Sequence, residues 1–214
     1  MSGRSFTNGL FFGAGMVIGL LMLMFFLAPQ IYLSTENSNF EKLREKSKLD
    51  CKTMPLHCLV RDEDINGVKT YIDKGSNLEF TDNWGRTALF YALWNDKHEI
   101  FKMLLSAGAD ANTMDENQRS VFFQSVAWDK YAMANRLLGK GAVIDRYNGS
   151  QYPETALHYC VMKNKPDCVE FLLKHGADRT LKDAYGYTVY ERVQMHNHID
   201  AKIGDLLNKE QQVK

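Results

Sequence analysis

The sequence has no excess of either charge, since 26 lysines and arginines are balanced by 26 aspartates and glutamates over 214 residues. A protein that holds nucleic-acid phosphates through long-range electrostatics needs a surplus of basic residues. The composition therefore argues against a DNA or RNA partner. With 45% hydrophobic and 24% charged residues, the chain is of ordinary globular type, long enough for one domain and one small appendage.

Sequence motifs of catalysis are also missing. The chain contains no G-x-S-x-G nucleophile elbow, no phosphate-binding glycine loop, no H-E-x-x-H pair and no paired-cysteine zinc knuckle. His196 and His198 are two residues apart, a spacing that does not place both on one face of a helix. We therefore predict no enzymatic activity, no cofactor and no metal site.

One long hydrophobic run is present, from Leu10 to Ala28, and it carries no charge. Its length suits a helix that crosses a hydrocarbon core, which predicts a transmembrane anchor over residues 10–28 behind a short tail at 1–9. A cleavable signal peptide is the alternative, but its apolar part is usually shorter. Two G-x-x-x-G spacings suggest a homodimer through the anchor, and they are formed by Gly9, Gly13, Gly15 and Gly19.

The positive charges that flank this run give conflicting signals about orientation. Arg4 precedes the run, whereas four basic residues follow it, and their number alone would keep the rest of the chain in the cytoplasm. Those four alternate with acidic residues in a segment, 29–51, that is typical of a partly helical linker. A short tail with one arginine resembles a bacterial signal anchor. We favour a single-pass inner-membrane protein whose larger domain lies in the periplasm.

A period of 33 to 35 residues governs the remainder of the chain. Glycine recurs at intervals of 33, 33 and 35 residues, at Gly75, Gly108, Gly141 and Gly176. A hydrophobic position recurs with it, as Leu56, Leu89, Phe122, Leu157 and Tyr190. Apolar residues follow helical spacing twice in each unit, as in ALFYAL and then EIFKMLL. Each unit is therefore predicted to be a pair of short helices that ends in a left-handed glycine cap.

These repeats resemble those of the ankyrin-repeat family. The resemblance rests on PLH at 55–57, on DNWGRTALFYA…IFKMLLSAGADAN at 82–112 and on ETALHYCVMKNKPDCVEFLLKHGAD at 154–178. It covers residues 52–208, leaves 209–214 as a tail, and implies an all-α solenoid of about five helix-turn-helix units with finger loops. The third unit reads RSVFF where the family has T-P-L-H, and the first and last units are degenerate. Terminal units are expected to be atypical because they present a polar end to water.

The resemblance also assigns roles inside the stack. His57 and His158 occupy the family's T-P-L-H position, where the imidazole typically satisfies backbone groups of a finger. Neighbouring units stack into a shared core because one helix pair cannot bury its apolar face alone. We assign to this core Leu89, Ala92, Met103, Leu104, Leu105, Leu137, Leu138, Leu157, Leu172 and Leu173.

The four cysteines fall into two local pairs, Cys51 with Cys58 and Cys160 with Cys168. The second pair lies on the two antiparallel helices of one unit, at positions that normally face each other. In an oxidising compartment these two residues can form a disulfide. The alternative is that both are small buried hydrophobic residues, and the sequence leaves the two interpretations open.

The partner-binding surface is predicted from position within the repeat, because finger tips and the exposed side of each first helix do not hold the stack together. All three tryptophans fall on this surface, and Trp, Tyr and Arg concentrate binding energy at protein interfaces. Alignment of the units gives Trp84, Arg86, Trp94, Asn95, Arg119, Trp128, Tyr152, Met162, Lys163, Tyr185 and Tyr187.

One finger, from Gly141 to Thr155, is two residues longer than the others. The extra residues must lengthen its tip around Asn148-Gly149, a dipeptide that suits a tight hairpin turn. The contact candidates in this loop are Tyr147, Tyr152 and Glu154, against the alternative of neutral loop variation.

Together with the anchor, these features resemble bacterial ankyrin proteins that act in the envelope. We expect a protein-binding module that serves as an immunity protein and neutralises by occlusion a toxin delivered into the periplasm, such as a type VI secretion phospholipase. The alternative is an envelope scaffold or stress-defence protein that binds its partner without inhibiting a toxin. The neighbouring gene would separate the two, since fold alone does not supply function.

Overall fold

The computed structural model describes residues 51–149, 151–196 and 199–209, and these ranges contain ten helices and no strand. The helices are α2 (Pro55–Arg61), α3 (Ile65–Asp73), α4 (Ala88–Trp94), α5 (His98–Ser106), α6 (Val121–Ala127), α7 (Tyr131–Leu138), α8 (Ala156–Met162), α9 (Pro166–Lys174), α10 (Val189–Met195) and α11 (Ala201–Lys209). The predicted anchor at 10–28 lies outside the described residues and stays a prediction. Within the described ranges, no helix has both the length and the apolar character that a membrane crossing requires.

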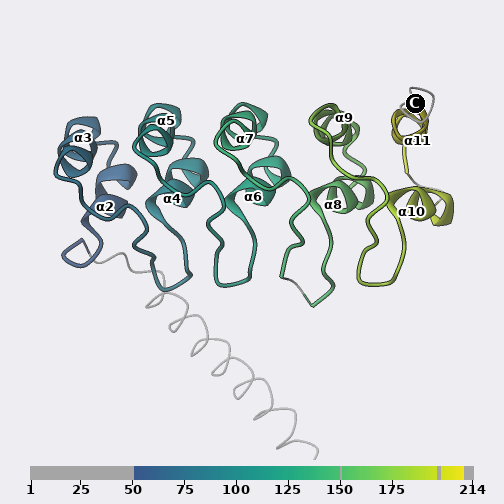
Figure 1. Cartoon of the computed structure of the whole chain (residues 1–214), viewed down its shortest axis with the longest axis horizontal. Coiled ribbons are helices and arrows are strands. Elements are labelled where there is room, and N and C mark those ends of the chain that lie inside the picture. The colour runs from purple at the N-terminus through teal and green to yellow at the C-terminus, as the bar shows by residue number, and fades with distance from the viewer. Residues whose placement is uncertain (1–50, 150, 197–198, 210–214) are drawn as a thin grey trace, which may run out of the picture. The chain divides into compact units, whose positions relative to one another are not determined.

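Figure 1 shows the described helices in two rows, with a finger loop between successive helix pairs. The first helices of the units (α2, α4, α6, α8 and α10) form one row, and the second helices (α3, α5, α7, α9 and α11) form the other. The finger loops extend from the row of first helices, away from the second row. The predicted all-α repeat with five helix pairs is therefore confirmed.

Local sequence explains where these helices begin and where the units end. A hydroxyl residue precedes four of the first helices, and in α6 the Ser120 hydroxyl accepts the backbone N–H of Phe123 at 3.0 Å. At α10, Thr188 and Glu191 form a reciprocal capping box. The repeated glycines behind the second helices have positive φ, for example +95° at Gly108, so the predicted left-handed caps are confirmed.

One core runs through all units of the stack. Eight of the ten residues assigned to it are buried, among them Leu104 and Leu137, which have no exposed surface. Met103 and Leu138 are only partly buried and pack against the edge of the core, so their assignment is corrected. On α5 the buried stripe consists of Ile100, Phe101, Leu104 and Leu105, and Met103 flanks it.

The two histidines of the T-P-L-H position bind the backbone of the next finger, as predicted. His57 Nε2 lies 2.9 Å from the carbonyl oxygen of Arg86, and His158 Nε2 lies 3.1 Å from that of Tyr187. Burial lowers the pKa of both imidazoles. The neutral ring therefore joins the start of one unit to the finger that follows it.

The second ring nitrogen distinguishes the two histidines. His158 Nδ1 lies 2.8 Å from the hydroxyl of Thr155, the N-cap of α8. The equivalent N-cap of α2 is Met54, which offers no hydroxyl, and among the described residues His57 Nδ1 is buried without a hydrogen-bond partner. A buried polar atom without a partner lowers stability.

Met54→Thr is expected to raise the free energy of unfolding by about 1 kcal/mol, because its hydroxyl can both cap α2 and bind His57. Urea denaturation of the wild type and the variant measures this change. Met54→Val is the matched control, since valine has the shape of threonine without the hydroxyl. Equal stability of the threonine and valine variants would show that no such bond forms.

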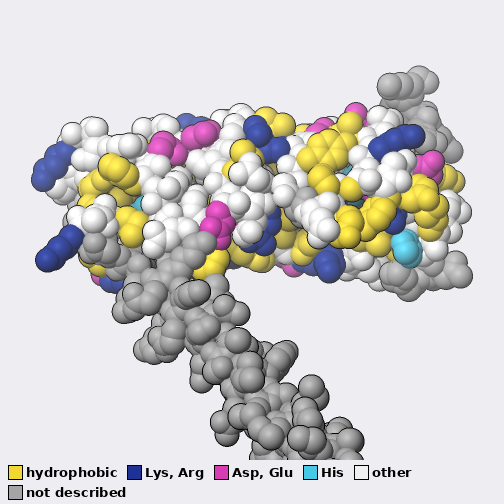
Figure 2. Space-filling model, turned by 90° about the horizontal axis from the view of Figure 1, so that it is seen from below, with side chains coloured by type: hydrophobic (Ala, Val, Ile, Leu, Met, Phe, Trp, Pro, Cys, Tyr) yellow, Lys and Arg dark blue, Asp and Glu magenta, His cyan; other side chains and the backbone are white. Residues whose placement is uncertain are grey.

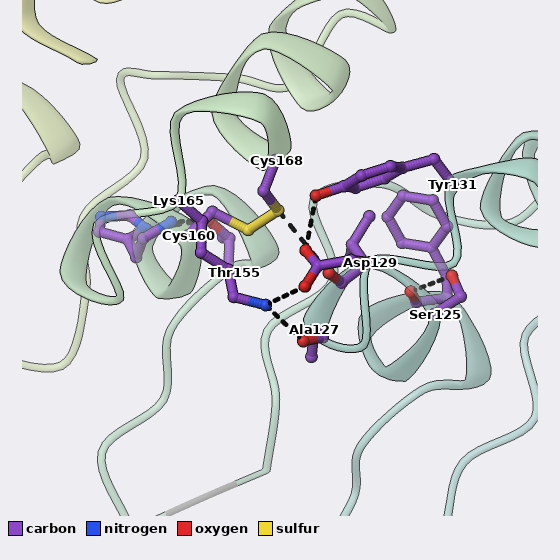
Figure 3. Close-up of a disulfide and its surroundings, with 11 residues drawn as sticks. Ser125, Ala127, Asp129, Tyr131, Thr155, Cys160, Lys165 and Cys168 are labelled. Atoms are coloured by element: carbon purple, nitrogen blue, oxygen red, sulfur yellow. Dashed lines mark hydrogen bonds and ion pairs between the residues drawn. A yellow bond between two sulfur atoms is a disulfide. The ribbon is translucent and has the colours of Figure 1, made fainter. Parts of the chain in front are cut away.

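Lysines join each unit to the one before it. Lys130 Nζ donates to the carbonyl of Leu93 at 2.6 Å, and Lys165 Nζ donates to the carbonyl of Ala127 at 2.8 Å. Lys165 also binds Asp129 Oδ2 at 2.7 Å, as Figure 3 shows. The two carbonyls belong to the last turns of α4 and α6, where carbonyl oxygens lack helical partners and a cation is favourable. These lysines thus stabilise the stack between units.

Disulfides join both cysteine pairs in the structure. Cys160 of α8 is bonded to Cys168 of α9, and both residues are fully buried between the two helices of one unit (Figure 3). Cys51, which precedes α2, is bonded to Cys58 within that helix. Cross-links over such short loops stabilise a fold by about 2 to 3 kcal/mol in the chain-entropy description.

Candidate partner-binding face

Each regular finger is folded around one aspartate. In the finger that precedes α4 (the α4 finger), Asp82 Oδ1 accepts the backbone N–H groups of Trp84 and Arg86 at 2.8 and 2.9 Å. Asp115 in the α6 finger and Asp183 in the α10 finger accept the N–H groups two and four residues further on in the same way. A side chain that binds its own following backbone fixes the turn, so these three tips share one conformation.

The α8 finger has Asn148 at this position, and it closes two residues later. The N–H of Asn148 donates to the carbonyl of Glu154 at 3.0 Å, and Asn148 Oδ1 accepts the N–H of Glu154 at 3.1 Å. Asn148 is buried and forms the base of the loop, so the predicted turn at Asn148-Gly149 is wrong. The lengthening itself is present beyond this base and carries the exposed residue Tyr152.

Backbone hydrogen bonds join neighbouring fingers near their tips. The N–H of Glu116 donates to the carbonyl of Trp84 at 2.7 Å, and the N–H of Ala184 donates to that of Pro153 at 2.9 Å. Between these, the N–H of Gly149 donates to the carbonyl of Gln118 at 3.1 Å. The four fingers therefore form a connected surface.

One aromatic cluster surrounds Arg86 on the α4 finger. The guanidinium donates to Asp82 Oδ2 from Nε at 2.9 Å and from Nη2 at 2.7 Å. Its Cζ atom lies 4.6, 5.3 and 5.7 Å from the ring centroids of Trp94, Tyr91 and Trp84. These distances are within the range of cation–π attraction. We call these five residues the Arg86 cluster.

The polar groups of the Arg86 cluster are matched to one another. Burial raises the pKa of the Tyr91 phenol to about 12, and the hydrogen bond that it donates to Asp82 at 2.9 Å acts in the same direction. Burial alone would raise the pKa of Asp82, but the donors from Arg86 and the backbone more than offset it and keep that pKa below its ordinary value. Both groups therefore hold fixed charge states near neutral pH.

A second aromatic site is a hollow of about 450 Å³ between the end of α8, the α8 finger and the α10 finger. The rings of Tyr152 and Tyr185 stack beside it with centroids 5.3 Å apart and planes inclined by 12°. Figure 2, which views the finger side, shows hydrophobic side chains gathered toward the α8 and α10 end of this face. We call this site the tyrosine hollow; it is lined by Tyr152, Pro153, Glu154, Tyr159, Met162, Lys163, Asp183, Ala184, Tyr185, Arg192 and His196.

The structure brings eight of the thirteen predicted contact residues into these two sites. Trp84, Arg86 and Trp94 belong to the Arg86 cluster. The tyrosine hollow contains five others, namely Tyr152, Glu154, Met162, Lys163 and Tyr185. The aligned positions thus form two separate centres on the finger side.

The remaining five predicted residues belong to neither site, although the ring of Tyr187 lies beside Arg192 of the tyrosine hollow, and four of the five have structural contacts. Arg119 pairs with Asp115 at 3.0 Å, as Arg86 does with its own aspartate. Two others donate from their side chains to backbone carbonyls, Asn95 to that of Tyr91 and Tyr147 to that of Lys182. Tyr187 contributes its own backbone carbonyl, which faces the imidazole of His158. Trp128 is exposed where α6 ends.

Several residues that shape this face were not among those predicted from the sequence. Asp82, Asp115, Asn148 and Asp183 determine the finger tips, and their spacings of 33, 33 and 35 residues were a usable signal. Arg192 was missed because it comes from α10, yet it pairs with Asp183 at 2.5 Å and lies over the ring of Tyr185. No group of three potential metal ligands gathers among the described residues.

Comparison with protein families matches residues 30–115 and 122–202, more than half of the chain, to Ankyrin repeats (3 copies). An ankyrin repeat protein of fowlpox virus is 32% identical over 126 residues, which cover 59% of this chain and 29% of that protein. An ankyrin repeat protein of Acanthamoeba polyphaga mimivirus is 30% identical over 156 residues, which cover 71% of this chain and 20% of that protein.

A third relative is the human SH3 and multiple ankyrin repeat domains protein 2. It is 27% identical over 137 residues, which cover 64% of this chain and 7% of that protein. The chain therefore spans less than a third of the length of each of these three relatives.

Proposed function

Because this chain belongs to the ankyrin-repeat family, whose repeats bind other proteins, we propose that the finger side is a docking surface that covers and inhibits a protein partner. The observation that carries the proposal is the gathering of large exposed aromatic side chains on one side of the stack. Trp94, Trp128, Tyr152 and Tyr185 are 53%, 41%, 53% and 57% exposed. Such side chains bury much area with few rotatable bonds when a partner arrives.

The stiffness of the face supports occlusion as its mode of action. The fingers are joined to one another by backbone hydrogen bonds, and each regular tip is fixed by its aspartate. A surface that is ordered before binding loses little conformational entropy when it binds. It can therefore cover an active-site mouth or a substrate-docking surface without rearranging.

We further propose that the partner is a toxin and that the chain is an immunity protein held at the bacterial inner membrane by residues 10–28. The hydrophobic run at these positions would keep the inhibitor close to the bilayer that a phospholipase attacks, which raises its effective concentration there. The two disulfides support a periplasmic position for the repeats, because such bonds persist in oxidising compartments.

Co-expression tests the immunity function. The product of the neighbouring gene is directed to the periplasm of a sensitive bacterial strain, together with the full chain. Wild type is expected to restore growth, whereas the double variant Trp94→Ala/Trp128→Ala, expressed at the same level, is expected to fail. Capture of the toxin without restored growth would favour a scaffold that binds without inhibiting.

Thiol labelling tests the compartment. Ser106→Cys introduces one exposed thiol at the end of α5, and we expect a membrane-impermeant maleimide to label it in intact spheroplasts. The wild-type chain, whose cysteines are all bonded in the structure, is the control. Labelling only after lysis would place the repeats in the cytoplasm.

A further inference from the structure

The protein uses one combination of groups twice on its finger side: a carboxylate, a guanidinium and aromatic rings. In the Arg86 cluster, the guanidinium is bound by Asp82 and lies over three rings. In the α10 finger, Asp183 binds Arg192, whose Cζ atom lies 4.8 Å from the ring centroid of Tyr185 and 5.1 Å from that of Tyr187. Carboxylate and ring together thus bind a planar cation in both places.

The α8 finger supplies the carboxylate and the rings without the guanidinium. Glu154 holds the position that Arg86 and Arg119 hold in the shorter fingers, so the sign of the charge is reversed there. It lines the tyrosine hollow together with Tyr152. The single arginine of this finger, Arg146, is turned toward the sulfur of Met114 in the preceding finger, at 3.8 Å.

Within the described part of the chain, the Glu154 carboxylate accepts one long hydrogen bond from a side chain. The one donor to it there is the side-chain amide of Asn148, at 3.4 Å from Oε1. Burial raises the pKa of Glu154, which reflects the cost of holding a charge in this half-buried place. A cation with N–H donors that entered the hollow would replace the lost water.

The cations that already line the hollow do not fill this role. Arg192 is bound to Asp183 by Nε and Nη2, each at 2.5 Å. Lys163 is exposed, and its Nζ atom lies 5.9 Å from the ring centroid of Tyr159. Lys163 is near enough to act electrostatically on Glu154 but forms no ion pair with it among the described contacts.

We propose that the tyrosine hollow receives an arginine side chain of the protein partner, with its guanidinium against the Glu154 carboxylate and the Tyr152 ring. This inference rests on the proposed docking function and names the chemistry of one anchor within it. Arginine suits the site better than lysine, because its flat group can lie on a ring and donate to a carboxylate at once. The Lys163 ammonium weakens the attraction of Glu154 for an incoming cation, because it carries the same charge as that cation.

Fluorine NMR of the full-length protein in detergent micelles, labelled with 3-fluorotyrosine, tests the inference. The probe is N-acetyl-arginine methylamide, and the resonances of Tyr152 and Tyr185 are assigned with Tyr→Phe variants. We expect the arginine probe to shift both resonances. Glu154→Gln is expected to weaken its binding about fivefold or more, the loss of one charge-assisted contact at a partly exposed site. Lys163→Met is expected to strengthen it, because a repelling charge is removed.

The controls separate this inference from the docking function. Glu99→Gln, which removes an exposed carboxylate on α5, is expected to leave probe binding unchanged. Shifts induced instead by N-acetyl-glutamate methylamide, with opposite effects of the two variants, would identify an acidic anchor and overturn the proposal. Absence of any shift would also overturn it. A further outcome is that the partner binds Glu154→Gln with full affinity but binds Trp94→Ala weakly. In that case the docking function stands while the arginine site fails.

Discussion

Leu104→Ala is expected to lower the free energy of unfolding by about 2 to 5 kcal/mol, the range for large-to-small changes in a close-packed core. Leu104 lies on α5, in the second of the five helix pairs, and has no exposed surface. The deletion removes buried methyl groups and leaves a cavity between units, and the neighbouring helices cannot close it without moving. Urea denaturation followed by circular dichroism measures the loss.

Met103→Ala is the matched control for this change. Met103 is adjacent on the same helix but only partly buried, so its truncation is expected to cost about 1 kcal/mol or less. The two variants differ in burial and share the same helix and a similar loss of volume. Equal destabilisation by both variants would show that the depth of burial on α5 does not determine how much a side chain contributes to stability.

Trp94→Ala and Trp128→Ala are each expected to weaken partner binding by roughly 2 kcal/mol, as truncation of central aromatic residues does at protein interfaces. Both side chains are largely exposed at the ends of α4 and α6, so thermal unfolding is expected to change little. Titration calorimetry with the purified product of the neighbouring gene measures the affinity.

Tyr190→Ala provides the comparison for the tryptophan variants. Tyr190 is an exposed aromatic residue as well, but it lies on the last unit away from both aromatic sites. It is expected to leave the affinity unchanged. If the tryptophan variants unfold while binding survives, their rings belong to the packing of the stack and the docking surface lies elsewhere.

The sequence was sufficient for the repeat because one physical constraint recurs with a fixed period. Each unit must bury one stripe of each helix, so the hydrophobic position of Leu89 reappears in all five units. The left-handed glycine of Gly108 reappears behind the second helix of the first four units. Met103 shows the limit of this reasoning, since an apolar residue beside a buried stripe is not itself buried. Periodicity assigns the face of a helix but not the depth of each residue on it.

The finger tips were less accessible to sequence reasoning, because they depend on hydrogen bonds between side chains and backbone. Asn148 was interpreted as a turn residue from its neighbour Gly149, although it holds the position of Asp82 and Asp115. The contacts of Arg192 with the α10 finger depend on how α10 packs, which no local pattern contains. Alignment of the units predicted the aromatic positions, whereas their grouping into two sites could not be predicted from the sequence.

The extra length of the α8 finger lies entirely beyond the hydrogen-bonded pair of Asn148 and Glu154. Residues can therefore be added or removed between these two positions without changing the register of any helix. If the partner changes in evolution, this loop can vary with little loss of folding stability. Residues that contact the partner and residues that stabilise the stack are different, so selection acts on them separately. The 35-residue interval in an otherwise 33-residue period places its two extra residues in this loop, and homologues of this chain are expected to differ most in length here.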